Sequence, residues 1–282
     1  MQKITSKDNE FVKHIKKLKD KKHRDESNEY VIEGIKIVKE AIQENAEIKQ
    51  IIICEDCENS GVIPKDLMYE IAKYECVYVT NKIFNSLTEV VNPQGIIAII
   101  NKSTGEKQID YSEEIIVALD DIQDPGNLGT ILRTADSVGL TQILVSKGTA
   151  DAFNPKVVRS TMGAIFRVKI IECEDLKQTL KEVQKHKFEL VVTSLQTEES
   201  FYDIDYNKKV IVIGNEANGV KQEIQDMADK KVKIPMLGKT ESLNAAVATG
   251  IMLYEYVRQK LRWFWGCIQN HLFFIIIYFF SF

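Results

Sequence analysis

Six short apolar runs in the second half of the chain constrain its fold more than any other feature of the sequence. They are rich in Val and Ile and mostly uninterrupted: IIVALD, QILVS, VKII, ELVVTSL, VIVIG and VKIPM, between residues 115 and 236. Such strands are typical of a parallel sheet that is buried on both faces. Helical patterns separate most of them, at residues 127–139, 175–186 and 222–229. The sequence therefore predicts a doubly wound α/β layer, whose ligands bind beyond the carboxyl ends of the strands.

An earlier alternating series, residues 29–101, predicts a smaller α/β domain. The strand-like runs EYVIEG, IKQIIIC, CVYVT and GIIAII alternate with helical patterns at residues 35–45, 66–74 and 81–90. The polar stretch KSTGEKQIDYS, residues 102–112, then ends the apolar run and is the expected linker. We therefore expect a small domain over residues 1–105, a larger domain over 106–262 and an atypical tail over 263–282.

The charge of the chain is unevenly distributed. The net charge is −4, yet residues 1–24 contain nine Lys or Arg against three Asp or Glu. An acidic protein with one basic end does not suit wholesale coating of DNA, but it does suit a local contact with phosphate.

The basic segment also has helical order. Apolar residues recur at helical spacing with lysines among them: Phe11, Val12, Ile15 and Leu18, with Lys13, Lys16 and Lys17. The lysines are either the solvated face of a packed helix or an arm that contacts phosphate. His14 and His23 lie in the same segment and are expected to be solvated or to face RNA.

The last twenty residues, 263–282, hold nine of the 24 aromatic residues and both tryptophans. A membrane-spanning helix needs about 20 mostly apolar residues. Here Gln269, Asn270 and His271 interrupt the segment and leave an apolar run of only nine residues. We expect an extension that packs on the surface, promotes self-association or is foreign to the working domain, rather than a membrane anchor.

The remaining composition favours a cytoplasmic protein without a metal. The N-terminus lacks a signal-peptide pattern, and five cysteines without disulfide-like spacing fit a reducing compartment. Cys54 and Cys57 have metal-like spacing, but no second pair or nearby His completes a site. His186 ends a helical pattern, where a positive charge suits the helix dipole.

Three polar turns that contain glycine follow strands of the larger domain. In the first, DDIQDPGNLGTILRTADSVG, residues 120–139, Asn127 is suited to cap the helix and Arg133 follows six residues later, near the beginning of that helix. Taken alone, this is equally a capped helix with a surface arginine.

The second turn, VIVIGNEANGV, residues 210–220, places Glu216 between two glycines, Gly214 and Gly219, which permit close backbone approach or positive φ. It is not a P-loop, because Val220 stands where lysine is required, and the chain has no G-x-G-x-x-G. The third turn, IPMLGKTESLNAAVATG, residues 234–250, leads from a strand-like start into a helix whose first residues are almost all small. Such a thin helix indicates that a ligand or another chain comes close to its backbone.

In this order, the three turns give the chain a family resemblance. It resembles the SpoU-type RNA ribose 2′-O-methyltransferases of the SPOUT superfamily over residues 115–260, with a looser match over 5–100 to their substrate-binding domain. NPKVVRSTMGAIFRV, residues 154–168, is similar to the family's connecting segment. The resemblance implies a deep trefoil knot at the C-terminal end of the catalytic domain, a homodimer, and S-adenosylmethionine bent against the knot.

The resemblance also implies the site residues. Four would line the cofactor pocket, mostly through backbone groups: Gly214, Ile234, Met236 and Leu243. Five match the polar positions associated with RNA and reaction: Asn127, Arg133, Glu216, Ser242 and Asn244. A guanidinium stays protonated at physiological pH, so we expect Arg133 to clamp the adjacent phosphate and stabilise alkoxide charge rather than act as a base.

The implied activity is S-adenosylmethionine-dependent methylation of a ribose 2′-hydroxyl in RNA. Ribosomal RNA is favoured over tRNA, because the resembling rRNA enzymes carry an extra N-terminal domain of this kind. The alternatives are a tRNA ribose methyltransferase and an RNA-binding or ribosome-assembly protein that keeps the fold without turnover. The sequence identifies neither the nucleotide nor the proton acceptor.

Overall fold

The computed structural model describes residues 2–102 and 108–279, with side chains described as far as Arg262 in the last helix. Its contacts divide the chain into two compact units. The first comprises Met1–Gln108, Asp124–Arg133 and Ala150–Lys169, and the second comprises Ile109–Gln123, Thr134–Thr149 and Ile170–Phe282. The centre of the predicted linker, 103–107, and the side chains of the predicted tail, 263–282, lie outside the described residues.

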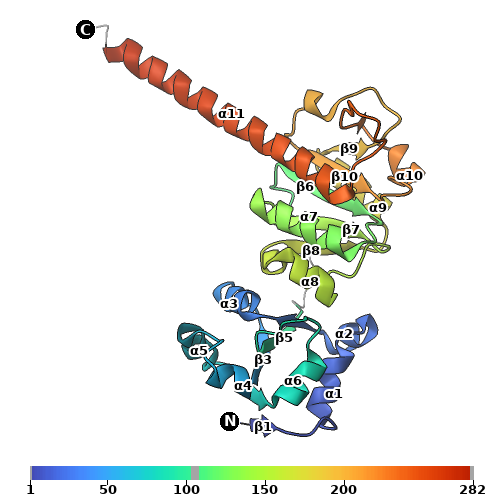
Figure 1. Cartoon of the computed structure of the whole chain (residues 1–282). Helices are drawn as coiled ribbons and strands as arrows, with labels where there is room; N and C mark the ends of the chain where they lie inside the picture. Colours follow the sequence, from blue (N-terminus) through green and yellow to red (C-terminus); the bar gives the residue numbers. More distant parts are fainter. Residues whose placement is uncertain (1, 103–107, 280–282) are drawn as a thin grey trace. The chain divides into compact units, whose positions relative to one another are not determined.

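The first unit is a mixed sheet covered by helices (Figure 1). Its strands are β1 (Gln2–Ile4), β2 (Glu29–Glu33), β3 (Ile48–Cys54), β4 (Cys76–Val79) and β5 (Ile96–Asn101). Its helices are α1 (Glu10–Lys17), α2 (Lys21–Ser27), α3 (Ile35–Gln43), α4 (Glu55–Asn59), α5 (Lys65–Ile71), α6 (Asn81–Leu87) and α8 (Pro155–Thr161), followed by the 3-10 turn η1 (Ala164–Phe166). The strand order is β1-β4-β3-β5-β2. The four predicted strands are confirmed, whereas β1 and α4 were not predicted.

Alternate residues of the central strand β3 enter two different cores. Ile51 and Ile53 pack with apolar residues of α3 and α5. Ile52 and Cys54 pack with those of α1 and α6 on the opposite face. Because successive strand residues point to opposite faces, this burial makes the unit a three-layer structure with the sheet in the middle.

The basic N-terminal segment forms helix α1 as predicted. Asn9 caps it by accepting from the backbone N–H of Phe11 at 2.9 Å. Val12, Ile15 and Leu18 are buried against the sheet, while Lys13 is exposed. The apolar face of this helix is therefore structural, and the lysines lie on its other side.

The second unit is built on a six-stranded sheet in the order β11-β9-β10-β6-β7-β8. Its strands are β6 (Ile115–Asp120), β7 (Gln142–Ser146), β8 (Lys169–Cys173), β9 (Glu189–Thr193), β10 (Lys209–Gly214) and β11 (Lys230–Val232). The helices that follow its strands are α7 (Pro125–Ser137), α9 (Leu176–Lys185), α10 (Gln222–Gln225) and α11 (Ala245–Phe279), with the 3-10 turn η2 (Phe201–Asp203). The contacts assign α7 as far as Arg133 to the first unit and the rest of it to the second.

The strand pairing confirms the predicted α/β layer. The pairs β11–β9, β9–β10, β10–β6 and β6–β7 are all parallel. Every residue of β6 and β10 is buried. One face packs on α9 and α10, and α11 contacts β10 (Figure 1). The chain runs from β6 outward through β7 to β8, crosses to β9 on the other side, returns to β10 between β9 and β6, and ends at the edge strand β11. This change of direction at β6 is characteristic of a doubly wound sheet. The trefoil knot stays a prediction.

Two element boundaries differ from the prediction. The last strand ends at Val232, so the predicted strand VKIPM is wrong over residues 233–236. Pro235 has no N–H to donate to a neighbouring strand, and this disfavours continuation of the strand. The helix predicted over 222–229 is only the short helix α10, Gln222–Gln225. Within the described residues, no helix has the length and apolar character needed to cross a membrane.

Candidate active site

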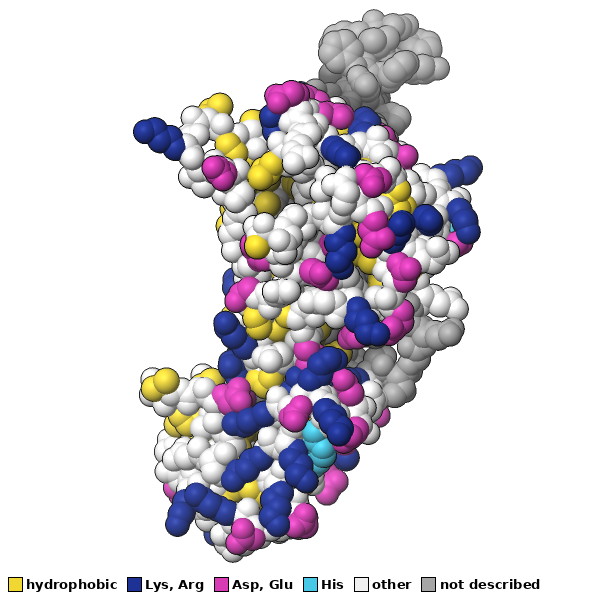
Figure 2. Space-filling view, turned by 90° about the vertical axis from the view of Figure 1, so that its right-hand side faces the viewer, with side chains coloured by type: hydrophobic (Ala, Val, Ile, Leu, Met, Phe, Trp, Pro, Cys, Tyr) yellow, Lys and Arg dark blue, Asp and Glu magenta, His cyan; other side chains and the backbone are white. Residues whose placement is uncertain are grey.

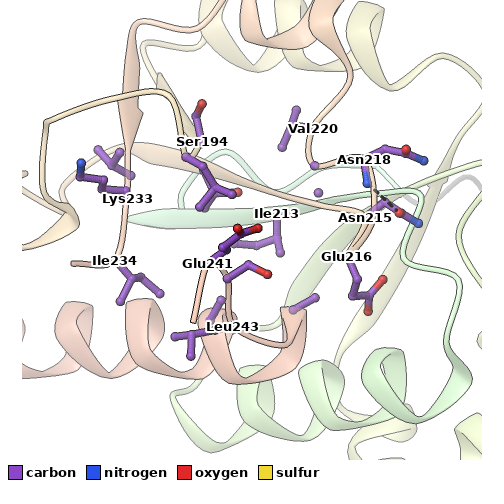
Figure 3. Close-up of a pocket in the computed structure, with 18 of the residues that line it drawn as sticks. Ser194, Ile213, Asn215, Glu216, Asn218, Val220, Lys233, Ile234, Glu241 and Leu243 are labelled. Carbon is purple, nitrogen blue, oxygen red and sulfur yellow. Dashed lines mark hydrogen bonds between the residues drawn. The ribbon is translucent and has the colours of Figure 1, made fainter. Parts of the chain in front are cut away.

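A pocket of about 420 Å³ lies at the carboxyl ends of β9, β10 and β11 in the second unit. Its walls come from residues 193–196 after β9, 213–220 around the end of β10, 232–236 after β11, and 241–252 at the start of α11 (Figure 3). Parallel strands bring their carboxyl ends to one edge of a sheet, and this is where a doubly wound layer binds its ligands.

The turn after β10 is shaped by its two glycines, each for a different reason. A Cβ on Gly214 would lie 2.1 Å from the carbonyl carbon of Gly219 and 2.2 Å from the backbone nitrogen of Val220. No side chain fits between backbone segments this close. Gly219 instead has φ +67°, a conformation that favours glycine. Of the two reasons for glycine considered from the sequence, close backbone approach therefore applies to Gly214 and positive φ applies to Gly219.

Asn215 holds the same turn from within. Its side-chain oxygen accepts from the backbone N–H groups of Ala217 at 2.8 Å and Asn218 at 3.2 Å. Its amide nitrogen donates to the backbone carbonyl of Asp121 at 2.8 Å. The turn is thereby anchored to the end of the neighbouring strand β6, and its exposed Glu216 is presented at the pocket wall (Figure 3).

An ion-paired cluster also holds the turn after β10 to the end of β6. Lys221 Nζ lies 3.1 Å from buried Asp120 and 3.0 Å from Asp121, and the Lys221 backbone N–H donates to Asp120 at 2.8 Å. Burial lowers the pKa of Lys221, but the bonds to Asp121 and Asp120 outweigh it and raise the pKa above its usual value. Lys221 is therefore charged at neutral pH and ties the far end of the turn to β6.

The third turn reaches the pocket as an irregular segment rather than as a strand. Lys233 still follows the sheet edge, since its backbone N–H donates to Glu199 and its carbonyl accepts from Phe201. Ile234 and Met236 line the pocket beyond this point. Ser242 and Leu243 complete this wall from the other end of the loop.

Asn244 directly precedes α11 and caps its N-terminus. Its side-chain oxygen accepts from the backbone N–H groups of Ala246 at 2.9 Å and Val247 at 3.3 Å. Ala245 and Ala248, on the first turn of the helix, line the pocket. Their small size thus lets the helix approach the cavity. At Gly250 an added Cβ would meet only ordinary contact, 3.9 Å from Thr134, so packing within the chain does not require glycine there.

The first turn differs from the prediction in its cap. Helix α7 begins at Pro125, and Asp124 accepts from the backbone N–H of Asn127 at 2.8 Å. Asn127 therefore lies inside the first helical turn, and its predicted capping role is wrong. Arg133 is exposed in the ninth position of this 13-residue helix, not near its beginning. Gly129 of the same helix allows close packing on α8, since a Cβ there would lie 2.4 Å from the Cβ of Ser160.

The pocket gathers most of the residues predicted for the site. Six of the nine line it: Gly214, Glu216, Ile234, Met236, Ser242 and Leu243. Asn244 caps the helix that bounds it, while Asn127 and Arg133 lie on α7.

Sequence reasoning missed residues 193–196, together with Lys233 and Glu241. One sequence feature could have indicated residues 193–196: the run ELVVTSLQ becomes polar directly after a buried strand. Among the residues described with side chains, no group of three or more His, Cys, Asp or Glu could hold a metal ion.

The lining suits a ligand with a flat apolar part and a positively charged part. Ile213, Ile234 and Leu243 offer apolar walls, while Glu216 and Glu241 place carboxylates at the margin (Figure 3).

Two family models match the chain. The SpoU rRNA Methylase family matches residues 114–254, and the MRM3-like substrate binding domain matches residues 9–98. Among characterised proteins, the chain is 33% identical over 256 residues to the 23S rRNA (guanosine(2553)-2′-O)-methyltransferase RlmP of Bacillus subtilis, covering 90% of this chain and 99% of that protein. It is 35% identical over 162 residues to the 23S rRNA (guanosine-2′-O-)-methyltransferase RlmB of Xanthomonas axonopodis, covering 57% and 65%.

Solved structures give the same picture. The AdoMet-bound rRNA methyltransferase from Sinorhizobium meliloti superposes with a TM-score of 0.81 at 33% identity, covering 92% of this chain and 98% of that one. An RNA methyltransferase of the TrmH family from Porphyromonas gingivalis superposes with a TM-score of 0.76 at 28% identity, covering 88% and 97%. The chain belongs to the SpoU rRNA methylase family.

Proposed function

We propose that this protein is an S-adenosylmethionine-dependent RNA methyltransferase that acts on a ribose 2′-hydroxyl of ribosomal RNA. The observation that carries the proposal is the pocket at the carboxyl ends of β9 to β11, built around the close approach of Gly214 to Gly219. RlmP and RlmB are both named as 23S rRNA guanosine methyltransferases, and this favours rRNA over tRNA as the substrate.

The pocket fits S-adenosylmethionine, which supplies an electrophilic methyl group on a sulfonium. Ile234, Met236 and Leu243 offer an apolar wall to the adenine. Glu216 and Glu241 place negative charge at the margin of a site for a cationic ligand.

We assign the reacting RNA to five polar residues. Arg133 holds the neighbouring phosphate and stabilises the developing alkoxide, since a guanidinium is a bidentate donor and cannot act as a base. Asn127 and Asn244 orient the ribose. The Asn244 oxygen also caps α11. Glu216 and Ser242 complete the polar set from the pocket wall. Much of the rate enhancement then comes from positioning.

A homodimer is part of the proposal. Three large side chains on α11 are about half exposed and recur every seven residues: Val247, Tyr254 and Leu261. A spacing of seven places them on one face of the helix, and an exposed apolar stripe of this kind suits a partner helix. The small residue Gly250 lies between the first two and permits close approach.

The remaining proposals concern organisation and location. We place the substrate-binding domain at residues 1–105, the methyltransferase domain at 106–262 and the atypical tail at 263–282. We also place the protein in the cytoplasm, where its rRNA substrate is, and the four described cysteines are free thiols, in keeping with a reducing compartment.

The deciding experiment is transfer of labelled methyl from S-adenosylmethionine to deproteinised rRNA from cells that lack the protein. Digestion to nucleosides should release a labelled 2′-O-methylnucleoside, and site mapping on that rRNA then identifies the nucleotide. A protein that binds rRNA tightly but never transfers methyl would be the non-catalytic assembly factor. Transfer of methyl to tRNA but not to rRNA would show that the substrate is tRNA.

A further inference from the structure

Two histidines and a glutamate form a hydrogen-bonded row in the first unit, outside the pocket. His14 Nε2 of α1 lies 2.6 Å from Glu29 Oε2 of β2. His14 Nδ1 lies 3.1 Å from His23 Nε2 of α2, with the two rings edge to face. The proposed methyl transfer uses none of these groups.

The buried end of the row, Glu29, determines which group donates in each of its hydrogen bonds. The Glu29 side chain is only 4% exposed and also pairs with Lys49. Burial raises the pKa of Glu29, but the bonds from Lys49 and His14 outweigh it and bring the pKa below its usual value. An ionised carboxylate can only accept, so His14 Nε2 carries the hydrogen. Nδ1 of a neutral His14 then accepts from His23 Nε2–H, and the His23 Nδ1 is left as an acceptor.

This arrangement accommodates one proton and resists a second. A proton on His23 Nδ1 leaves both hydrogen bonds of the row intact. A further proton on His14 Nδ1 would oppose two N–H groups at 3.1 Å. One added proton therefore leaves a hydrogen on the outer His23 Nδ1, whether its charge lies on His23 or on His14 beside Glu29.

The surroundings of that outer end are mixed in charge. Glu26 of α2 lies 4.0 Å from His23 Nδ1 and also 3.8 Å from Lys22. At the inner end, Glu29 and Lys49 face His14.

The wider face of α1 and α2 is lysine-rich. Lys13, Lys21 and Lys22 are exposed, and each also pairs with a carboxylate of its own helix. Figure 2 shows this face, with histidine (cyan) at the surface among Lys and Arg (dark blue) and neighbouring Asp and Glu (magenta). A cationic surface of this kind is the usual footprint of a phosphate backbone.

We propose that His23 is a phosphate contact of the RNA substrate, and that binding of RNA to this face takes up one proton at His23 Nδ1. The inference rests on the proposed function and adds a pH-dependent contact to it. A neutral Nδ1 and a phosphate oxygen are both acceptors, whereas the protonated Nδ1–H donates a charge-assisted hydrogen bond. RNA affinity therefore falls as rising pH removes this proton.

The test measures proton uptake on the full-length protein with deproteinised 23S rRNA as the probe. Calorimetry at pH 8 in two buffers of different ionisation enthalpy should give an uptake of up to one proton per bound RNA. Between pH 6 and pH 8 the affinity should fall by up to about tenfold per pH unit. His23→Gln should abolish the uptake, flatten the pH dependence and reduce the salt slope by about one.

The matched control is His186→Gln. His186 stacks on Tyr111 in the second unit, with centroids 3.6 Å apart, and its replacement should leave the proton uptake unchanged. An uptake by His23→Gln equal to that of the wild type, or none in the wild type, overturns the inference. Wild-type protein that takes up the proton but never transfers methyl would instead overturn the proposed function and leave the phosphate contact standing.

Discussion

Arg24 and Asp151 form a buried ion pair between residues that are 127 positions apart in the sequence. The Arg24 side chain is only 2% exposed, and it also donates to the backbone carbonyls of Leu18 at 2.8 Å and Lys19 at 2.7 Å. The last basic residue of the N-terminal segment is therefore structural. It closes the turn between α1 and α2 and fixes the segment Ala150–Lys169 to the first unit.

Replacement of Arg24 by Met should destabilise the protein by about 3–5 kcal/mol, because it leaves the Asp151 charge buried without its partner. Chemical denaturation monitored by circular dichroism measures this loss. Lys22→Met, at an exposed site in the same helix, is the matched control and should change the free energy of unfolding by less than about 0.5 kcal/mol. A loss below about 1 kcal/mol for Arg24→Met would show that the pair is dispensable.

Gly214→Ala should abolish binding of S-adenosylmethionine. The added methyl group would lie 2.1 Å from the backbone of Gly219, so the turn that forms one wall of the pocket must move. Gly238→Ala, in the loop between β11 and α11, meets nothing within 4 Å and should bind normally. Titration calorimetry on both variants, with circular dichroism to check folding, makes the comparison. Normal affinity in Gly214→Ala would contradict the role given to this close approach.

Local pattern predicted the fold well where burial is continuous along a strand. The bounds of β6 and β7 coincide with the apolar runs IIVALD and QILVS. The prediction failed at β11, where Ile234 and Met236 are apolar because they line a pocket rather than a sheet. It also could not place the segment Ala150–Lys169, whose position depends on distant contacts such as that between Asp151 and Arg24.

The site was predictable to the extent that parallel strands bring their carboxyl ends together. This rule predicts that the turns lie at one edge of the sheet, and the family resemblance then implies Gly214, Glu216 and Leu243, all three of which line the pocket. It could not distinguish Asp124 from Asn127 as the cap of α7, since both residue types cap helices well. The loop at 193–196 was missed because it contains no glycine and reads as an ordinary connection.

The buried carboxylate of Glu255 should make stability depend on acid pH. Hydrogen bonds from Arg258, at 2.6 and 2.7 Å, outweigh burial and lower the pKa of Glu255 below its usual value of about 4.3. A lowered pKa contributes stability that is present above the unfolded-state value and lost as the pH falls through the folded-state value. The free-energy difference between the wild type and Glu255→Gln should thus be largest near pH 7 and shrink towards pH 3. A difference that is constant with pH would mean that packing, not charge, stabilises this position.

Deletion of residues 263–282 should leave cofactor binding and methyl transfer intact, because every proposed site residue lies upstream. Solubility should improve through removal of an aromatic cluster. Light scattering measures the oligomeric state and shows whether the tail or the exposed face of α11 forms the dimer. The truncated protein should remain a dimer, whereas Tyr254→Arg in the full chain should dissociate it. Loss of folding on truncation would show that the proposed boundary at residue 262 is wrong.

The roles of Arg133 and the pocket loop can be separated by kinetics. Arg133→Ala should lower methyl transfer by on the order of a hundredfold or more, the scale of losing one charge-stabilising donor. Folding should be unaffected because the side chain is exposed. Binding of S-adenosylmethionine should change little, since Arg133 is not among the lining residues of the pocket.

Two further variants sharpen this test. Arg133→Lys should rescue transfer only in part, because a point charge does not reproduce a bidentate fork on phosphate. Leu243→Arg should instead abolish cofactor binding, since this side chain lines the pocket and a larger, charged group would fill it. Single-turnover rates and cofactor affinities on the same preparations distinguish the two effects. If Arg133→Ala lost the cofactor yet turned over normally at saturation, α7 would belong to the cofactor site, and the assignment of Arg133 to RNA would be wrong.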